Sequence, residues 1–477
     1  EPFTVSGINA PTPISIEGGQ YAINDNPYTS AAGTVRNGDT VRVKVTSSGK
    51  LQTDVKATLT IGGVAGTFIV TTLADTTAPI AQITFPPPMS LKEAETILVR
   101  GIASDDYSGI KSLTVNGVEA KFSDETNWTA TVPLNEGAND IVVKVVDESG
   151  NADDEAAVVV VHRGEEDGAF PTSENPITYG HQVTFDKANN RLLVTNWSSG
   201  GGVSSVIAVD FLTGNRSLLS GPSKPNSENL FQRPLGIVVD ANADRNRALI
   251  VDAGDMIIAM DLTDGSRQVL SDYATPTSDQ PELDTPTNIA LDPDNPDIAY
   301  IVDEGVSNVQ ILNLITGART ILSDNDNVGT GPAFRYPASI LIDSANKRAL
   351  VGDGAATTAA LFSVDLATGD RTIISDLTTP QESLPLYGAL SIVSDNVTEY
   401  VYFDSGLDGI LKVDVASGVR EQFFAPFSTT TANYVHSLHL EPGFSFLFYL
   451  DNRTRGVYAI DLESAQYVVI SKSAAPM

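Results

Sequence analysis

Aromatic, cationic and imidazole residues recur at fixed spacing along the chain from Pro176 onward. Six turns, most of which begin with an acidic residue, recur along this part of the chain. We call the set of equivalent positions in the repeats a column. The first column lies seven residues before each turn and holds Tyr179, Arg233, Thr285, Tyr336, Tyr387 and Tyr434. Two residues later, a second column holds His181, Leu235, Thr287, Ala338, Ala389 and His436, and the next position holds Gln182, Gly236, Asn288, Ser339, Leu390 and Ser437. Tyrosine rings can stack on sugar rings, while amide and guanidinium groups can bond sugar hydroxyls. The columns therefore predict a binding site wherever the fold gathers them.

The candidate ligand-binding residues come from these columns, with Arg335 added because it directly precedes a column tyrosine. They are Tyr179, His181, Gln182, Arg233, Asn288, Arg335, Tyr336, Tyr387, Tyr434 and His436. In the alternative interpretation, the tyrosines pack under neighbouring loops with their hydroxyls bonded locally, and the histidines are ordinary core residues. His439 lies within an apolar run, where we expect a buried imidazole with its hydrogen bonds satisfied.

Each repeat contains a second apolar run, and the residue at the end of that run is an aspartate in five repeats and an asparagine in one. These positions are Asn196, Asp252, Asp303, Asp353, Asp404 and Asp451. Carboxylate oxygens bind calcium, so calcium is the cofactor that Asp252, Asp303, Asp353, Asp404 and Asp451 would take. The competing interpretation is that each side chain fastens a neighbouring loop by accepting hydrogen bonds from backbone N–H groups. A ring of six positions is too wide for one ion to contact every member, so no metal site is firm.

The elements that position these residues form an internal repeat with four expected strands in each unit. A turn recurs at Asp210 to Gly214, Asp261 to Gly265, Asn313 to Gly317, Asp365 to Gly369, Asp414 to Gly418 and Asp461 to Ala465. Consecutive turn glycines stand 51, 52, 52 and 49 residues apart, which predicts the blades of a six-bladed β-propeller. Two residues after each glycine stands an arginine, which we expect to pair with the turn acid: Arg216, Arg267, Arg319, Arg371 and Arg420. The sixth unit carries Ala465 and Tyr467 instead, as expected of a terminal repeat.

The connections between blades are long and polar, and they span residues 221–233, 272–285, 324–336, 376–386 and 425–433. In a four-stranded meander, these connections and the turns after the second strands lie on the same side of the propeller, which we name the crossover face. Long connections collected on one face favour a recognition surface. Because the first and last blades of a propeller meet, we also expect His181 and His436 to be neighbours near the axis.

Residues before the repeat show two further groups of short apolar runs separated by Gly, Asn, Asp and Pro. We expect a small β-sandwich over residues 1–75, an immunoglobulin-like sandwich over 76–163 and the propeller over 164–477. The predicted fold class is therefore all-β, with two sandwich modules followed by a six-bladed propeller.

Two short segments, Ala103 to Ile110 (ASDDYSGI) and Val145 to Asn151 (VVDESGN), resemble bacterial immunoglobulin-like modules of exported proteins. Val35 to Val41 (VRNGDTV) is similar to another module of that kind. The second strands of the repeat, Ala248 to Asp252 (ALIVD) among them, resemble those of the NHL-repeat and YWTD propeller families. These resemblances imply a bacterial protein with spacer modules before a propeller scaffold, and that scaffold hosts binding modules and enzymes alike.

The composition of the chain limits the classes of partner that it can bind. The chain has 29 basic and 60 acidic residues, and its net charge of −31 repels nucleic acid and anionic lipid. It has no cysteine, which excludes disulfides and thiol chemistry. No apolar run reaches the ~20 residues of a membrane span, and the chain starts at Glu1, as expected of a processed or truncated protein. We expect an exported protein, whether extracellular, cell-surface or periplasmic, with no direct membrane insertion.

The combined expectation is a recognition protein whose crossover face binds an extracellular glycan or protein. One alternative is an enzyme at the central funnel. A uronate lyase would use His181, His436, Tyr179 or Tyr434 as base beside Arg233, whereas a hydrolase resembling gluconolactonases would find only Asn288 and Gln182 as amides in the matching column. No common hydrolase, phosphate-loop or metalloprotease motif is present, so no catalytic residue is firm. A third alternative is a structural subunit of a surface assembly.

Overall fold

The computed structural model describes residues 1–472, apart from 165–174, 198–203, 355–358, 381–383, 385, 387–390, 395–399, 405–408, 426–434 and 453. In this part of the chain, regular structure consists of β-strands and two short 3-10 turns, η1 (Lys187–Asn189) and η2 (Ala243–Arg245). The described residues include no helix that is long and apolar enough to cross a membrane. The predicted all-β class is confirmed.

The backbone divides into two compact units, which are described separately. Unit one comprises residues 1–82, 102–128 and 142–157, and unit two comprises 83–101, 129–141 and 158–477. Unit two contains the whole internal repeat.

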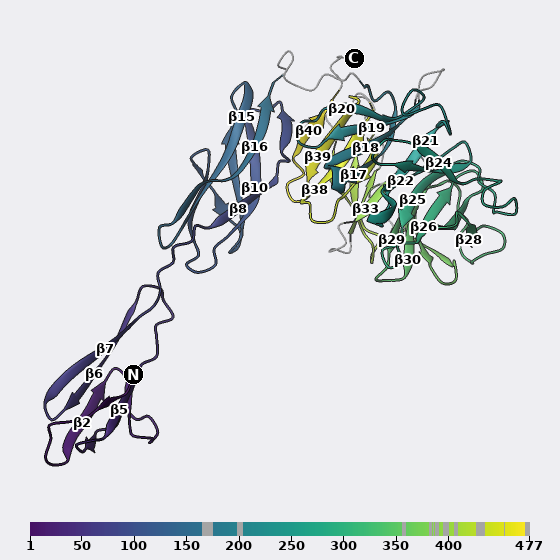
Figure 1. The fold of residues 1–477 in the computed structure, drawn as a ribbon. Helices are drawn as coiled ribbons and strands as arrows, with labels where there is room; N and C mark the ends of the chain where they lie inside the picture. Colours follow the sequence, from purple (N-terminus) through teal and green to yellow (C-terminus); the bar gives the residue numbers. More distant parts are fainter. Residues whose placement is uncertain are drawn as a thin grey trace. The chain divides into compact units, whose positions relative to one another are not determined.

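The first seven strands of unit one form two sheets around a small core (Figure 1). Their bounds are β1 (Phe3–Thr4), β2 (Thr12–Glu17), β3 (Gln20–Ile23), β4 (Gly33–Val35), β5 (Thr40–Lys44), β6 (Asp54–Ile61) and β7 (Val64–Thr71). One sheet has the order β1-β5-β3 and the other the order β4-β2-β6-β7. Ile14, Tyr21, Val35 and Val41 are buried between them, as in the small sandwich that the sequence predicts.

The next nine strands form the second sandwich. Their bounds are β8 (Ile80–Phe85), β9 (Met89–Lys92), β10 (Thr96–Ser104), β11 (Ile110–Val115), β12 (Val118–Glu119), β13 (Lys121–Phe122), β14 (Asn127–Pro133), β15 (Gly137–Asp147) and β16 (Ala152–Arg163). One sheet has the order β13-β14-β10-β8, and the other contains β12-β11-β15-β16-β9. Burial alternates along β15, as expected of a strand with one face in a core, and Trp128 is fully buried.

The internal repeat forms six groups of four antiparallel strands, in chain order within every group; five are separate sheets, and the sixth is the end of a nine-stranded sheet that also contains β9 of the second sandwich. The first three sheets contain β17 (Gly180–Asp186), β18 (Arg191–Asn196), β19 (Ser205–Asp210) and β20 (Arg216–Ser220); β21 (Pro234–Val239), β22 (Arg247–Asp252), β23 (Met256–Asp261) and β24 (Arg267–Ser271); and β25 (Pro286–Leu291), β26 (Ile298–Asp303), β27 (Asn308–Asn313) and β28 (Arg319–Ser323). The last three contain β29 (Pro337–Asp343), β30 (Arg348–Asp353), β31 (Ala360–Asp365) and β32 (Arg371–Ser375); β33 (Ile392–Ser394), β34 (Tyr400–Asp404), β35 (Ile410–Asp414) and β36 (Arg420–Phe424); and β37 (Val435–His439), β38 (Phe446–Asp451), β39 (Gly456–Asp461) and β40 (Tyr467–Ser471).

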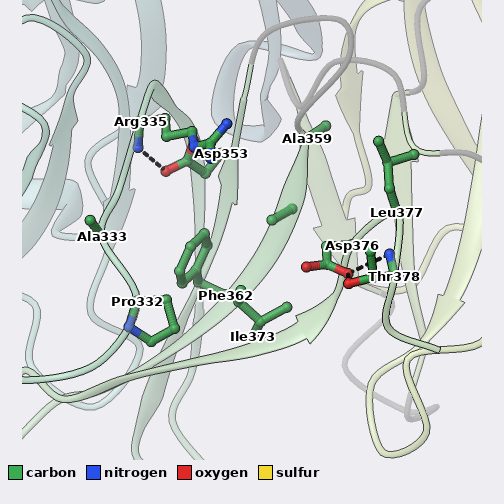
Figure 2. A pocket seen from close by; sticks show the side chains of 11 residues that line it. Pro332, Ala333, Arg335, Asp353, Ala359, Phe362, Ile373, Asp376, Leu377 and Thr378 are labelled. Carbon is green, nitrogen blue, oxygen red and sulfur yellow. Dashed lines mark hydrogen bonds between the residues drawn. The ribbon is translucent and has the colours of Figure 1, made fainter. Parts of the chain in front are cut away.

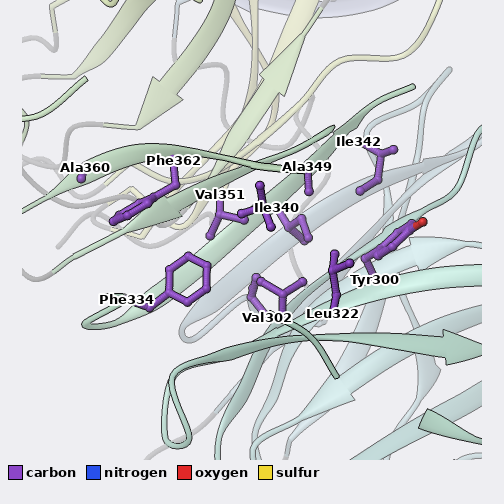
Figure 3. Packing of buried hydrophobic residues seen from close by; sticks show 12 residues of the cluster. Tyr300, Val302, Leu322, Phe334, Ile340, Ile342, Ala349, Val351, Ala360 and Phe362 are labelled. Atoms are coloured by element: carbon purple, nitrogen blue, oxygen red, sulfur yellow. The ribbon is translucent and has the colours of Figure 1, made fainter. Parts of the chain in front are cut away.

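Consecutive sheets pack face to face through apolar side chains. Between the third and fourth sheets, Val302, Phe334, Ile340, Val351 and Phe362 belong to one buried cluster (Figure 3). The first strand of each sheet contacts the first strand of the next, and β17 contacts both β21 and β37. Six sheets, with contacts that join the sixth to the first, give the six-bladed propeller that the repeat predicts.

Within unit two, the sixth blade gains a neighbour from the sandwich. Strand β9 pairs with β40, with Val469 opposite Leu91. Lys92 Nζ donates a hydrogen bond to the backbone oxygen of Tyr467 over 2.9 Å. Arg100 forms an ion pair with Asp461, over 2.6 Å from its Nη1 to Oδ1. The terminal blade, whose turn lacks both Gly and Arg, is therefore covered at its outer strand by residues 83–101.

The prediction that the repeated arginines pair with the turn acids is wrong. Arg267 Nη1 donates to Ser220 Oγ over 2.6 Å and to the backbone oxygen of Gly221, and its Nε and Nη2 donate to backbone oxygens of residues 226–229. The same bond links Arg319 to Ser271, Arg371 to Ser323 and Arg420 to Ser375. Each guanidinium is thus buried against the preceding blade, where it satisfies the carbonyl oxygens of the connection. The turn acids instead accept hydrogen bonds from their own turns, as Asp365 Oδ1 does from the backbone of Ala367 and Thr368.

Candidate functional site

The ends of the second strands hold the connections of the crossover face in place. Asp252 accepts the backbone N–H groups of Gln232 and Arg233 at 3.0 and 2.9 Å, and Asp353 accepts those of Arg335 and Tyr336 at 2.7 and 2.9 Å. Asn196 and Asp303 make the equivalent bonds, accepting the backbone N–H groups of Thr178 and Asp284. The loop-fastening interpretation is confirmed for these four side chains. Asp451 accepts a backbone N–H from Thr454 in its own turn, and the connection that it would fasten lies outside the described residues apart from Ala425.

Burial shapes the charge of these carboxyls. Desolvation raises the pKa of Asp252 and Asp353 despite the backbone hydrogen bonds that they accept. For Asp303, burial outweighs the bonds from Asp284, Val306 and Gly305 and raises the pKa to about 6. Their oxygens are already used by the loops, and these loops present the exposed residues of the crossover face. The side chain of Asp404 lies outside the described part of the chain.

An aromatic and cationic cluster lies at the start of the first blade on the crossover face. The rings of Tyr179 and His181 have centroids 5.1 Å apart, and the Tyr179 ring meets that of Trp197 edge to face at 5.8 Å. The Arg233 guanidinium, from the next blade, lies 5.3 Å from the centroid of the Trp197 ring. Tyr179 is 37% exposed, and Arg233 is also exposed. The structure therefore brings Tyr179, His181 and Arg233 together, as the columns predict.

Sequence reasoning missed Trp197. It directly follows the second-strand end Asn196, and its backbone N–H donates to the carbonyl oxygen of Tyr179 over 2.9 Å. The chain has only two tryptophans, and the other, Trp128, is buried in the sandwich core. A tryptophan, one of two in the chain, directly after a second-strand end was the signal available in the sequence.

Two predicted amides lie deeper than the cluster. Gln182 Oε1 accepts the backbone N–H of Ile237 over 2.5 Å and so links the first strands of the first two blades. Asn288 is buried. The position of Gln182 favours a part in holding the first two blades together, and the burial of Asn288 weighs against direct contact with a ligand.

A pocket opens in the fourth blade of the same face, with a cavity volume of about 410 Å³. In Figure 2, Arg335 and Asp353 lie on one side of it, with Phe362 below them, and Asp376 and Thr378 lie on the other side. The full lining is Pro332, Ala333, Arg335, Asp353, Ala359, Ala360, Phe362, Ile373, Asp376, Leu377 and Thr378. This volume lies within the ~300–1,000 Å³ of small-molecule sites, and the lining combines an apolar floor with a few polar groups. The predicted residue Arg335 thus lines a pocket, and its neighbour Tyr336 is 47% exposed.

Of the two acids that line the pocket, Asp353 and Asp376, only Asp376 has a lowered pKa, and it stays ionised. Burial raises the pKa of Asp376, but hydrogen bonds from Thr378 and Thr379 outweigh it, and the net pKa is lowered. Arg335 and Asp376 therefore give the pocket groups of opposite charge.

Three predicted residues have side chains outside the described part of the chain: Tyr387, Tyr434 and His436. Strands β17 and β37, which carry His181 and His436, are neighbours: the backbone N–H of Val183 in β17 donates to Ser437 Oγ in β37 over 3.1 Å. The Nε2 of His439 accepts the backbone N–H of Phe185 over 3.3 Å, as predicted, but the ring is half-buried and not fully buried.

The fold and site define an all-β protein whose propeller exposes an aromatic cluster and a pocket on one face. In sequence, residues 79–163 match the family described as glucodextranase, domain B. None of the curated proteins compared with the chain matches it.

Similar folds occur among solved structures at low identity. An auxiliary nutrient binding protein from Bacteroides thetaiotaomicron is 12% identical, with 79% of this chain and 96% of that chain covered and a TM-score of 0.45. One from Bacteroides ovatus is 13% identical, with 83% and 98% covered and a TM-score of 0.43. A structure of a nidogen/laminin complex is 14% identical, with 60% and 90% covered and a TM-score of 0.42. These similarities are too distant to assign a function.

Proposed function

We propose that this protein is an exported bacterial binding protein whose propeller takes an extracellular carbohydrate on its crossover face, without catalysis. The observation that supports this proposal is the cluster of Tyr179, Trp197 and Arg233. Partly exposed aromatic rings beside a guanidinium offer apolar faces for sugar rings and donors for their hydroxyls. The two sandwich modules would then serve as spacers.

The charge of the protein bears on the class of carbohydrate. A net charge of −31 repels polyanions, so neutral oligosaccharides are favoured over uronate polymers. The same repulsion weighs against a uronate lyase, because its substrate would carry many carboxylates. Arg233 and Arg335 are the exposed cations near the cluster and the pocket, and each would recognise a single hydroxyl or carboxylate.

Binding is tested by screening the full chain against neutral and uronate oligosaccharides and titrating each hit by calorimetry. Trp197 provides a local optical signal because the second tryptophan is buried in the sandwich. We expect Trp197→Ala and Arg233→Ala to weaken binding about tenfold or more, the equivalent of ~1.4 kcal/mol. Tyr107→Ala is the matched control, since Tyr107 is an exposed aromatic residue of the sandwich, and it should leave affinity unchanged.

Three results would contradict the proposal. If the wild type and both cluster variants bind the oligosaccharide with equal affinity, the binding site lies outside the cluster. Product formation from a glycan or lactone that is lost in His181→Ala would make the protein an enzyme. Concentration-dependent oligomers with no glycan binding in the screen would instead support a structural subunit, and a protein ligand captured through the same cluster would replace the carbohydrate.

A further inference from the structure

Three aspartates from separate segments of unit one meet outside the propeller. Asp75 lies between β7 and β8, Asp105 directly follows β10, and Asp147 is the last residue of β15. One carboxylate oxygen from each lies within 4.8 Å of those of the other two. Asp147 is fully buried, and Asp75 is 7% exposed. Three acids gathered at this depth need a compensating charge, because burial and mutual repulsion both disfavour their ionised forms.

Hydrogen bonds satisfy only part of this cluster. Asp75 Oδ1 accepts from the backbone N–H and hydroxyl of Thr77, at 3.0 and 2.8 Å. Asp105 Oδ2 accepts three backbone N–H groups from residues 107–109, and Asp147 accepts from Asn151 through both oxygens. The other oxygens of the first two acids, Asp75 Oδ2 and Asp105 Oδ1, are buried and make no hydrogen bond of normal geometry with the described residues. The Ser108 hydroxyl lies beside both acids: it donates to Asp105 Oδ2 over 3.4 Å, and its interaction with Asp75 lowers the pKa of that carboxyl.

Among the described residues, no side-chain cation balances the charge, since none of their ion pairs includes Asp75, Asp105 or Asp147. Buried carboxylate oxygens without a hydrogen-bond partner, in a cluster of three acids, are the arrangement that a bound cation would satisfy.

We propose that Asp75, Asp105 and Asp147 form a calcium site where the chain enters the second sandwich. The donor set consists of oxygens alone, with neither imidazole nor thiolate, which favours a hard cation over zinc or copper. Calcium accepts six to eight oxygens in flexible geometry, so backbone carbonyls or water can complete three carboxylates, whereas magnesium demands near-octahedral geometry.

The bound ion would fasten the chain segment before β8 to two loops of the sandwich. Asp75 is already held there weakly, since Asn151 Nδ2 donates to its backbone oxygen over 3.3 Å. Calcium would add direct bonds from Asp75 to the loops that carry Asp105 and Asp147. The stability of the sandwich would then depend on calcium, independently of what the propeller binds.

The test is thermal unfolding of the full chain with and without calcium. Trp197→Phe is used as the background, so that Trp128, buried in the sandwich core, is the tryptophan that reports unfolding. Extracellular calcium modules have Kd values of ~10⁻⁴–10⁻³ M, so roughly 5 mM CaCl₂ is compared with EDTA. A ligand in about tenfold excess over its Kd should raise the Tm of this small domain by on the order of 5 °C or more.

Variants assign the effect to the cluster. Asp75→Asn and Asp105→Asn should abolish most of the shift, and Asp75→Asn should melt above its parent in EDTA because it relieves repulsion. Asp124→Asn is the matched control: Asp124 lies in the same sandwich and accepts hydrogen bonds from its own turn, from the backbone of Thr126 and Asn127 at 2.8 and 2.7 Å. It should keep the full calcium shift.

Direct binding keeps the proposal testable if a variant fails to fold. Calorimetric titration of the wild-type chain with CaCl₂ should show saturable binding in the same concentration range. The proposal is overturned if the wild type shows no binding heat and no shift in Tm, or if Asp75→Asn and Asp105→Asn keep the shift. An equal shift with magnesium would overturn the assignment to calcium. Stabilisation by acid alone, with no calcium effect, would show that the acids share a proton instead.

Discussion

Arg216 of the first blade donates a hydrogen bond from Nε to Oγ of Ser471 in the sixth blade, over 2.9 Å and across 255 residues of sequence. Its Nη2 also donates to the backbone oxygen of Arg455 over 2.7 Å. Burial lowers the pKa of Arg216 to about 10, so the guanidinium is still charged at neutral pH. The arginine–serine hydrogen bond that links the first five blades in succession thus also links the sixth blade to the first.

Removing the Ser471 hydroxyl should weaken this junction. Ser471→Ala leaves a buried, charged N–H without its acceptor, which should lower the free energy of unfolding by about 1–3 kcal/mol. The measurement is urea unfolding followed by Trp197 fluorescence. Ser217→Ala, at an exposed position beside Arg216 in the same strand, should change stability by less than about 0.5 kcal/mol. Equal effects of the two substitutions would show that the junction rests on apolar packing alone.

The junction between the fifth and sixth blades uses different chemistry. Phe424 stands where other blades have serine, and Tyr467 stands where they have arginine; their ring centroids lie 5.9 Å apart. Tyr467→Arg should therefore destabilise the protein, because Phe424 offers no hydroxyl to the buried guanidinium. Adding Phe424→Ser restores an acceptor. A double-mutant cycle should give a favourable coupling of about 0.5–3 kcal/mol, and strictly additive effects would contradict the exchange.

The turn glycines are required by contact with the neighbouring blade as well as by backbone conformation. Gly317 has φ +74°, and a Cβ on it would lie 2.1 Å from the backbone oxygen of Leu270. Gly317→Ala should therefore lower stability by about 3 kcal/mol or more, the sum of left-handed strain and overpacking.

Gly443→Ala separates the two contributions. Gly443 has φ +93° with no atom within 4 Å of an added Cβ, so strain alone should lower stability by about 1–2 kcal/mol. Ala465, which takes the turn position in the sixth blade at φ +54°, shows that alanine can adopt this conformation. If urea unfolding gives the same loss for both substitutions, the close approach to Leu270 has no energetic role.

The sequence was sufficient to predict the six blades because each contains the same turn at nearly constant spacing. It did not reveal where the arginines point, since that depends on which strand end lies beside them after blades pack. The signal was nevertheless present: arginine and serine stand four residues apart in one strand but bond across blades. Because the arginine of one blade bonds the serine of the preceding blade, the sixth blade and the fifth blade lack the two members of the same bond: Tyr467 replaces the arginine and Phe424 replaces the serine.

The candidate site was predictable in part. Tyr179 and Arg233 follow from the columns, because equivalent positions of a repeat occupy equivalent places around the axis. Trp197 belongs to no column and could be placed only by the loop that carries it. The three aspartates of the proposed calcium site lie before one strand, after another and at the end of a third, far apart in sequence, so only the tertiary structure brings them together.

Titration of Asp303 should make the free energy of unfolding depend on pH. Its pKa of about 6 in the folded protein lies above the ordinary value of 3.8. Between these values the folded state binds more protons than the unfolded state, so this contribution to stability is fully present below pH 3.8 and is lost as pH rises through 6. Asp303→Asn cannot titrate. The stability of the wild type relative to this variant should thus be greater at pH 4.5 than at pH 7, by about 2 kcal/mol.

Asp365→Asn is the control because its shift has the opposite sign. Backbone hydrogen bonds from Thr368 and Ala367 lower the pKa of Asp365, so its contribution is present above its ordinary pKa and disappears only in stronger acid. The stability difference between wild type and this variant should stay constant from pH 4.5 to 7. Urea unfolding at the two pH values, followed by Trp197 fluorescence, measures both differences. If the Asp303→Asn difference is constant or grows toward pH 7, the buried carboxyl does not hold its proton more tightly in the folded state, and the loops it fastens must accommodate its charge.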